Sequence, residues 1–456
     1  MEGGRWGLVI IFAAFMIQFI TFGTSFAMGV YAVEFLDYFK DDAFAVSFIL
    51  SINLGVFLGS GPFVGYLMTK FSHRLIVLVG GVMSTVGLLM IPILPYLPAL
   101  YIFYGLLNGL GCCMSYTPSH VLSGLYYDKY QSLSTGVATS GSGLGSAVMP
   151  ILAGYLIEEF TWKGSLYIIS GINLHVLVFG ALLRPVPKSA KTSLSDSNIG
   201  IKSDINNETK MALLDIQENK NSTGSVDKTP IIKKVAGSCL AKIYHNHLFV
   251  FQNFGFVVYC INNICWNCSC AITVTFIPDY LVEQGIERID AAFIVTITGL
   301  GTFIGGVAGA ILGNIPWINR LGLFSFSNIV FGVCCFIFVW ISDYVDYLTV
   351  GFVSGFVFGI TLALLLVLVT DFLGMEHLGH GLGYLLLANG IGAFVGPPIA
   401  GKIEEMYGSY EPSLYTAGVI CVIGGCLLVL MPIQKALMKD DSRQCKETEI
   451  TLTTEV

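Results

Sequence analysis

The chain has 456 residues, of which 54% are hydrophobic and only 12% are Asp, Glu, Lys or Arg, and it carries a formal net charge of −7. Soluble globular domains carry about 25% charged residues, because their surfaces need them. This composition excludes an ordinary soluble enzyme, a nucleic-acid-binding protein and a disordered protein, and it indicates a protein that crosses a membrane several times.

Twelve segments are long and apolar enough to cross a bilayer, because a membrane helix needs about 20 mostly apolar residues. The predicted spans are 7–35, 44–69, 75–94, 98–125, 131–157, 163–183, 249–278, 290–312, 320–342, 347–373, 380–406 and 412–434. The first span lacks the short apolar core and small-residue cleavage site of a signal peptide, so we expect it to be retained. The pattern therefore predicts an all-α membrane protein.

A polar stretch separates the first six spans from the last six. It contains NNETK and IQENKNSTGSVDK and few aromatic residues, so it cannot bury enough apolar surface to fold alone. We therefore predict a six-helix half at 1–187, a disordered cytoplasmic linker at 188–246, a second six-helix half at 247–434 and a cytoplasmic tail at 435–456.

The distribution of Lys and Arg predicts the orientation. If the N-terminus is inside, the outer loops hold only four of the 23 basic residues, namely Lys40, Lys163, Arg288 and Lys402. Cytoplasmic loops of membrane proteins carry the excess of Lys and Arg. Both termini are therefore predicted to be cytoplasmic.

The first span carries two polar residues towards its outer end, Tyr31 and Glu34. Tyr31 is a candidate for substrate contact. Glu34 is a candidate for a role in coupling or gating, because acids inside membrane spans are costly and usually functional. The alternative for Glu34 is an interfacial position from which its carboxylate reaches water.

The second and fourth spans each contain one asparagine near the middle, Asn53 and Asn108. Each is a candidate to bind substrate, and the alternative is a hydrogen bond between helices. Lys70 and Arg74 follow the second span at the predicted inner face, where we consider them candidates for a gate.

Small residues and prolines mark the fifth and eleventh spans. Gly141 and Gly145 allow close helix packing, and Pro150 and Pro397 are expected to bend their helices.

The seventh span has the densest group of polar side chains, Asn262, Asn263, Trp266 and Asn267. Residues four apart share a helix face, so these form two pairs, 262 with 266 and 263 with 267. Both pairs are candidates to line a substrate cavity, and the alternative is helix–helix hydrogen bonding. Cysteines 265 and 268 have a C-x-x-C spacing, but no second pair with histidines follows, so we expect no metal site.

The predicted spans contain no Lys or Arg near their middle, where a charge costs about 2.5–3.5 kcal/mol. A bound carboxylate would therefore need amide or hydroxyl donors, or the N-terminus of a broken helix. Thr302 in the eighth span is a further candidate for substrate binding. Asp371 ends the tenth span at the inner face, where it is either a gate contact to the opposite half or an interfacial charge.

The chain ends in Thr454, Glu455 and Val456. This fits the Ser/Thr-x-apolar form that PDZ domains bind as an added strand. A PDZ-domain protein is therefore a candidate partner, and the alternative is a coincidence of sequence.

The two halves carry similar sequences at nearly the same spacing. The segment from Pro150 to Tyr167 resembles that from Pro397 to Tyr415, and Gly65 to Arg74 resembles Gly309 to Arg320. An even number of spans in each half keeps its orientation, so the repeat is parallel. Two parallel six-helix pseudo-repeats, twelve transmembrane helices in all, resemble the plan of the major facilitator transporters.

The segment before and within the fifth span, YYDKYQSLSTGVATSGSGLGSAVMP, resembles the signature of the monocarboxylate transporter family. That signature reads Tyr-Phe-x-Lys-Arg-x-x-Leu-Ala-x-Gly, then Ala-x-Ala-Gly-Ser-x-x-Gly. The matching residues are Tyr127, Lys129, Leu133, Gly136, Ala138, Gly141, Ser142 and Gly145. The resemblance implies the major facilitator fold, a plasma-membrane location and, as in some relatives, a single-span ancillary partner.

The chain departs from this family at the charged residues that couple lactate to a proton. Members that do so pair a lysine on the first span with an aspartate and an arginine on the eighth. The matching positions here are Val30, Thr302 and Gly306. We therefore expect an atypical member that does not use this coupling.

The function expected from these observations is secondary-active or facilitative transport of small monocarboxylates or related small organic metabolites by alternating access. Two alternatives remain: transport of zwitterionic or neutral metabolites of the amino acid, creatine or carnitine type, and a metabolite receptor that does not transport. We expect no enzyme activity and no cofactor. The expected partners are the metabolite and the lipid bilayer, and no nucleic acid.

Overall fold

The computed structural model describes residues 4–39, 43–127, 129–185 and 249–430, and within these ranges every regular element is a helix. The predicted linker at 188–246 and tail at 435–456 lie outside the described residues. So do Thr454, Glu455 and Val456, and PDZ binding stays a prediction.

The helices of the first half run from α1 to α8. Their bounds are α1 Gly4–Phe39, α2 Ala43–Gly59, α3 Gly61–Lys70, α4 His73–Ile93, α5 Leu97–Leu100, the π-helix η1 Tyr101–Asn108, α6 Gly109–Leu125, α7 Gln131–Asn173 and α8 His175–Leu182.

The helices of the second half follow residue 253. Their bounds are α11 Phe254–Glu283, α12 Arg288–Leu312, α13 Arg320–Trp340, α14 Tyr344–Leu373, the short 3₁₀-helix η5 Met375–His377, α15 Leu378–Tyr407 and a last helix, Glu411–Leu430. The two halves form a single compact unit, and residues 185–253 separate from it as a second unit, whose described part includes the 3₁₀-helix η4, Phe249–Gln252.

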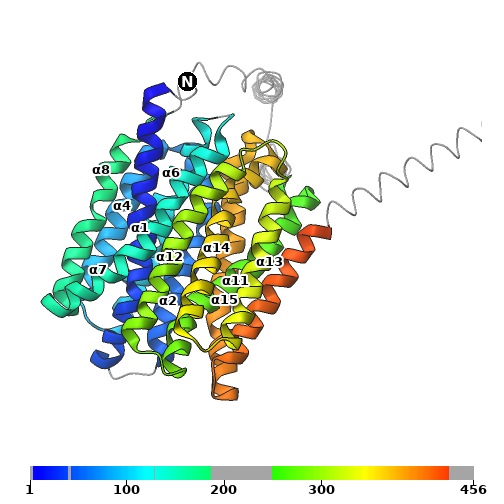
Figure 1. The fold of residues 1–456 in the computed structure, drawn as a ribbon. Helices are drawn as coiled ribbons and strands as arrows, with labels where there is room; N and C mark the ends of the chain where they lie inside the picture. The colour runs from blue at the N-terminus through cyan, green and yellow to red at the C-terminus, as the bar shows by residue number, and fades with distance from the viewer. Residues whose placement is uncertain (1–3, 40–42, 128, 186–248, 431–456) are drawn as a thin grey trace, which may run out of the picture. The chain divides into compact units, whose positions relative to one another are not determined.

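Eleven helical segments of the described chain are long and apolar enough to cross a membrane. One of them, Gln131–Leu182, has 52 residues, and because one crossing needs about 20, it has the length for two. Its backbone leaves the helical region at Thr161, with φ 60° and ψ 166°. Figure 1 shows the α7 ribbon reversing at one end of the bundle before it returns to α8. The predicted all-α bundle of twelve crossings is therefore confirmed.

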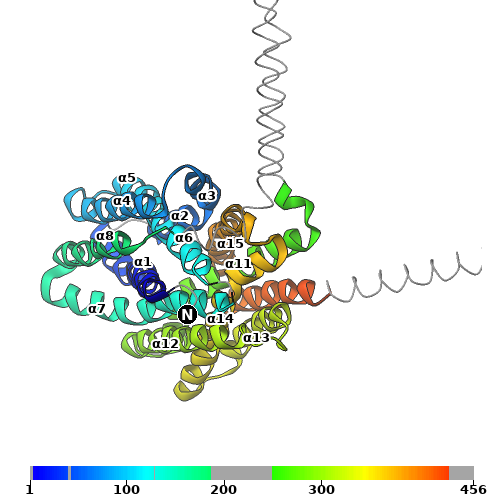
Figure 2. The ribbon, with the colours of Figure 1, turned by 90° about the horizontal axis from the view of Figure 1, so that it is seen from above.

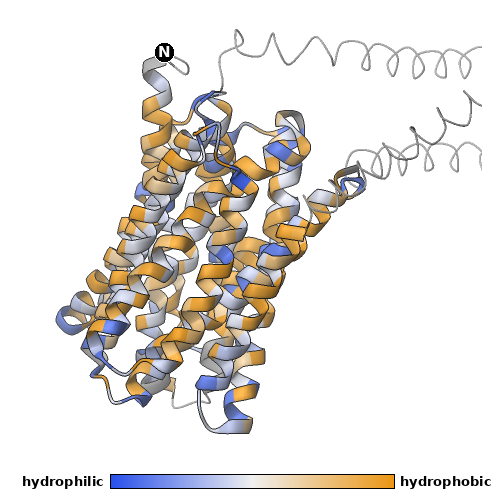
Figure 3. Ribbon diagram, turned by 45° about the vertical axis from the view of Figure 1, so that its right-hand side comes forward, coloured by the Kyte–Doolittle hydropathy of each residue, from blue (hydrophilic) through white to orange (hydrophobic). Residues whose placement is uncertain are grey.

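Twelve crossings bring the start of α1 and the end of the last helix to the same side of the bundle, which we call the terminal face. The opposite side is the far face. Figure 3 shows apolar residues along the length of the helices, with hydrophilic residues gathered at the two ends. Large apolar side chains such as Phe12, Ile151 and Phe326 are more than half exposed on this outer surface, as expected where lipid surrounds a protein.

The two halves meet mainly through two sets of helix contacts. Helix α7 packs against α12 and α14, and α2 and α3 pack against α15 (Figure 2). These two sets of contacts make up most of the interface between the halves.

Close approach of helix backbones depends on glycine at the predicted packing positions. A methyl group added to Gly145 of α7 would overlap the carbonyl oxygen of Phe19 in α1, and one added to Gly141 would overlap that of Phe15. Pro150 lies inside α7 and Pro397 inside α15. Small residues of this kind let the backbones of membrane helices approach closely. Close packing matters in a bilayer because the lipid provides no hydrophobic drive for helix association.

Candidate functional site

A cavity of about 80 Å³ lies between the two halves. The first half contributes residues of α1, α2 and α6 to its wall, and the second half contributes residues of α11, α14 and α15. The aromatic and polar residues of the wall are Phe22, Phe26, Tyr116, Trp266, Asn267, Thr275, Phe358 and Asn389. Because both halves form the wall, a movement of one half against the other would change access to the cavity.

The wall is mainly aromatic and aliphatic. The rings of Trp266 and Phe358 stack with their centroids 5.1 Å apart, and Phe22 meets Tyr116 edge-on at 5.4 Å. None of the residues that form this wall is Asp, Glu, Lys, Arg or His. A molecule in the cavity would therefore meet apolar surfaces and uncharged hydrogen-bonding groups only.

Three residues of the wall each carry a buried polar atom that has no hydrogen-bond partner within the described chain. These atoms are the Trp266 indole Nε1, the Asn267 Nδ2 and the Asn389 Oδ1. Buried polar groups in proteins are nearly always paired, and leaving one unpaired costs about 1–3 kcal/mol. Trp266 and Asn267 were predicted from the sequence as cavity candidates, and the structure places both on the wall.

Tyr116, in α6, is in contact with a histidine of the same helix. The His120 Nδ1 lies 2.9 Å from the Tyr116 hydroxyl oxygen, and His120 is completely buried. Sequence reasoning did not single out Tyr116, His120 or Asn389. The spacing of Tyr116 and His120, four residues apart on one helix face, was the available signal.

The other two asparagines of α11, Asn262 and Asn263, do not belong to the cavity wall. The Asn262 Oδ1 accepts a hydrogen bond from the Asn328 Nδ2 at 3.1 Å, and the Thr361 hydroxyl donates to the Asn328 Oδ1 at 3.2 Å. The Asn263 Nδ2 donates to the Tyr259 carbonyl oxygen, one turn back, at 2.8 Å. The contacts of Asn262 and Asn328 tie α11 to α13 and α14 and fit the alternative of helix–helix hydrogen bonding, whereas the Asn263 bond stays within α11.

The asparagines of the first half form a similar network. The Asn53 Nδ2 donates to the Asn108 Oδ1 at 3.0 Å and to the Tyr104 carbonyl oxygen at 2.7 Å. The Asn108 Nδ2 donates to the Ser84 carbonyl oxygen at 2.9 Å. Asn53 and Asn108 thus connect α2, η1 and α4, and neither belongs to the cavity wall.

Tyr31 and Glu34 lie in the part of α1 nearer the far face. Tyr31 is buried, and its hydroxyl forms a hydrogen bond with the Ser165 hydroxyl of α7. Glu34 is half-buried. Tyr31 packs within an apolar cluster that includes Phe35 and Trp162, away from the cavity wall.

The positions that replace the coupling charges face the partner half. Thr302 lies against Gly143 of α7, and a Cβ added to Gly306 would lie 3.0 Å from the Ser140 Cβ of the same helix. Neither Thr302 nor Gly306 belongs to the cavity wall. Small side chains at these positions allow α12 to pack directly on α7.

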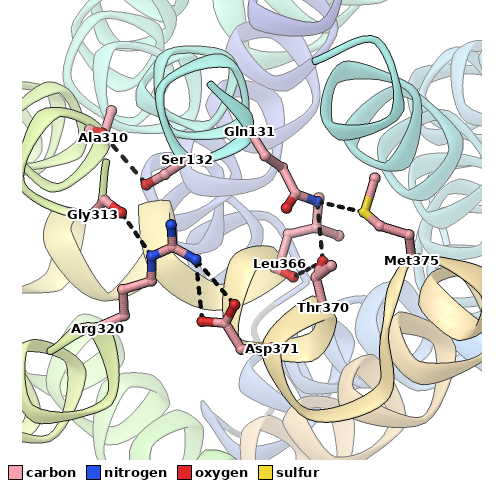
Figure 4. Close-up of polar contacts among 9 residues, drawn as sticks. All are labelled: Gln131, Ser132, Ala310, Gly313, Arg320, Leu366, Thr370, Asp371 and Met375. Carbon is pink, nitrogen blue, oxygen red and sulfur yellow. Dashed lines mark hydrogen bonds and ion pairs between the residues drawn. The ribbon is translucent and has the colours of Figure 1, made fainter. Parts of the chain in front are cut away.

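Polar contacts join the two halves at the terminal face (Figure 4). The Gln131 Nε2 of α7 donates to the Thr370 hydroxyl of α14 at 3.0 Å and lies 3.3 Å from the Met375 sulfur. The Ser132 hydroxyl donates to the Ala310 carbonyl oxygen of α12 at 3.4 Å. We call these contacts the terminal latch, because they hold the halves together on the side where the chain begins.

Three of the four residues predicted for gating or coupling, Lys70, Arg74 and Asp371, lie near this face, whereas Glu34 lies nearer the far face. Asp371 accepts from the Arg320 Nη1 at 3.0 Å, and Arg320 belongs to the same half. Asp371 directly follows Thr370 of the terminal latch in α14, and its own ion pair stays inside one half (Figure 4). Lys70 and Arg74 are exposed, and the Lys70 ammonium lies 4.6 Å from the centroid of the Tyr66 ring.

Within the described residues, no group of three or more His, Cys, Asp or Glu side chains is arranged to hold a metal ion. The site is built from neutral side chains and aromatic rings. Such an arrangement can bind and release a small molecule, and it presents neither an activated nucleophile nor a pair of carboxylates.

The comparisons with known proteins agree with this architecture. The family described as Major Facilitator Superfamily matches residues 10–397 and 319–450. Human monocarboxylate transporter 14 is 25% identical, over 94% of this chain and 91% of its own. Monocarboxylate transporter 9 of Pongo abelii is 27% identical over 94% and 93%, and monocarboxylate transporter 1 of Bos taurus 24% over 97% and 88%.

The E. coli fucose:proton symporter FucP shares the fold, with a TM-score of 0.64 at 15% identity over 94% of this chain and 99% of that one. The predicted resemblance and the predicted fold are therefore both confirmed. The chain belongs to the major facilitator superfamily of membrane transporters, and its monocarboxylate transporter relatives match it over nearly its whole length.

Proposed function

We propose that the central cavity binds a small organic metabolite, a monocarboxylate or a related molecule, and that rocking of the two halves exposes it to each side in turn. The observation that supports this most is the wall itself, which both halves share and which carries unpaired polar atoms at Trp266, Asn267 and Asn389. Those atoms need partners, and a bound solute would supply them.

We further propose that transport does not depend on a proton gradient through the family's usual charged set. Val30, Thr302 and Gly306 stand at its three positions, and the latter two pack against α7. A neutral wall would bind a carboxylate through hydrogen bonds alone, so no fixed charge of the site would have to be neutralised in the return step.

The test is uptake into liposomes that contain the purified full-length chain. Radiolabelled L-lactate, L-alanine and propane-1,2-diol represent anionic, zwitterionic and neutral solutes of similar size. We expect at least one to enter faster than into protein-free liposomes, with a rate that is unchanged by a pH gradient of one unit. A proton symporter would accumulate substrate about tenfold under that gradient, so acid-driven lactate accumulation would refute the uncoupled mechanism. Binding of a solute without flux would instead favour a receptor.

The proposal places the chain in the plasma membrane with both termini in the cytoplasm, as the distribution of Lys and Arg suggests. An epitope added to the N-terminus should then be stained in cells only after permeabilisation. Staining of intact cells would reverse the assigned orientation. An epitope inserted between Lys402 and Gly408, at the far face, is the matched control, because it should be stained in intact cells.

A further inference from the structure

Helix α6 brings a tyrosine of the cavity wall into contact with a buried histidine. The His120 Nδ1 is 2.9 Å from the Tyr116 hydroxyl oxygen, and the two rings meet edge-on with centroids 5.3 Å apart. The other ring nitrogen, Nε2, is buried and has no hydrogen-bond partner within the described chain. Because Tyr116 lines the cavity, the pair joins a buried histidine to a residue of the cavity wall.

The direction of the hydrogen bond decides what Tyr116 can offer to a ligand. A neutral imidazole donates from one nitrogen and accepts at the other. If Nδ1–H donates to the tyrosine oxygen, the hydroxyl hydrogen is free for the cavity and Nε2 is a bare acceptor. If the hydroxyl donates to Nδ1, Nε2 becomes a buried N–H without a partner. Buried N–H groups without a partner are rarer than buried acceptors without one, so the first arrangement is favoured.

A donor that itself accepts a hydrogen bond is strengthened, because successive hydrogen bonds polarise one another. We propose that Tyr116, oriented by His120, is the donor by which the first half binds a carboxylate or carbonyl oxygen of the substrate, and that Asn389 on the opposite wall accepts from a hydroxyl or amino group of the same molecule. His120 acts as a positioning residue, since it reaches the substrate only through Tyr116.

The remaining unpaired atoms of the wall agree with this assignment. The Trp266 Nε1 is a donor only, and the unpaired Asn267 atom is its Nδ2, also a donor. Three donors and one acceptor, without a charged side chain, suit a small carboxylate that carries one donor group. The substrate class is therefore a hydroxy- or amino-substituted carboxylate, a deduction that rests on the proposed transport function.

The experiment measures L-lactate and L-alanine uptake into liposomes and uses the better-carried of the two as the probe. Tyr116→Phe is expected to raise KM about 12- to 150-fold, because a hydrogen bond to a charged group contributes about 1.5–3 kcal/mol. His120→Leu should raise KM similarly, and His120→Asn should restore most of it, because its amide N–H can take the place of Nδ1–H. In a protein that already carries Tyr116→Phe, His120→Leu should raise the KM little further, because both substitutions act through the same hydroxyl.

Tyr31→Phe is the matched control. It removes a buried tyrosine hydroxyl that bonds Ser165 outside the cavity wall, so the KM should change less than about twofold. Thermal melting of each purified variant checks that it is folded. If wild-type liposomes carry propane-1,2-diol but neither of the two probes, only this assignment fails, and if they carry none of the three solutes, the transport function fails as well. If they carry one of the two probes and Tyr116→Phe leaves its KM unchanged, only the assignment fails. The same holds if His120→Leu raises the KM as much in the Tyr116→Phe protein as in the wild-type protein.

The opposite wall has its own test. Unlabelled propionate, which lacks the hydroxyl or amino group, should compete with the probe at least about tenfold more weakly than lactate or alanine does, because it leaves Asn389 unpaired. Asn389→Leu should remove that preference. Equal competition by propionate in the wild-type protein would contradict the role of Asn389.

Discussion

Gly145→Val is expected to destabilise the transporter strongly, whereas Gly154→Val on the same helix is expected to be tolerated. At Gly145 the new side chain would overlap the Phe19 carbonyl oxygen, which is backbone and cannot move without separating α1 from α7. Overpacking a tight contact costs about 1–3 kcal/mol and occasionally more, and a clash with backbone belongs at the upper end. Natural proteins have only about 5–15 kcal/mol of stability to lose.

Size-exclusion chromatography of the detergent-solubilised variants, together with their thermal midpoints, measures this effect. A Cβ at Gly154 meets no atom within 4 Å, so this variant controls for adding a branched side chain to α7. If the two variants elute and melt alike, the close packing of α1 on α7 does not stabilise the protein.

Gly61→Ala is expected to leave the protein folded but to bias it towards the state in which the terminal face is open. The added methyl group would overlap the Gly383 carbonyl oxygen, and these residues belong to opposite halves, in α3 and α15. Because the halves must part here when the terminal face opens, the clash raises the energy of one transport state rather than of the fold. A cost of about 1–3 kcal/mol corresponds to a 5- to 150-fold shift between the two states.

The shift can be followed at Cys270, which lies on the cavity wall. With the other cysteines replaced by serine, labelling of Cys270 by an impermeant maleimide from the terminal side should become faster, and transport should slow. Gly379→Ala is the control, because a Cβ there meets only the flexible end of Met68, at 3.7 Å. Gln131→Ala, which removes a bond of the terminal latch, should shift the states in the same direction by about 2- to 12-fold. Unchanged labelling in Gly61→Ala would show that this contact does not control opening.

The fold could be predicted from the sequence because its main determinants are local. The length and spacing of apolar segments count the crossings without reference to their neighbours, and even the paired spans at 131–157 and 163–183, which the structure joins in one long helical segment, are separated by their composition. The similarity between the segments after Pro150 and Pro397 indicated two parallel halves.

The site could be predicted only in part. Helical periodicity groups Asn262 with Trp266 and Asn263 with Asn267, but it does not say which part of each face meets the cavity and which meets a neighbouring helix. In the structure, Trp266 and Asn267 belong to the wall, while Asn262 bonds Asn328 of α13 and Asn263 bonds the backbone of its own helix. The choice depends on how α11 is rotated against the other half.

Tyr116 and Asn389 were missed for the same reason. Tyr116 lies in α6 of the first half and Asn389 in α15 of the second half, and they line one cavity only because the two halves dock. Asn53 and Asn108 illustrate the converse, since they have the composition expected of a binding site and yet bond each other within one half.

The neutral wall also determines how the transport cycle responds to membrane voltage. When the empty protein changes state, no charged side chain of the described cavity wall crosses the membrane field. Moving one elementary charge through a potential of 100 mV involves about 2.3 kcal/mol, and at this wall only a bound substrate would carry such a charge. An anionic cargo would therefore make the cycle electrogenic, while a zwitterion would cross without current.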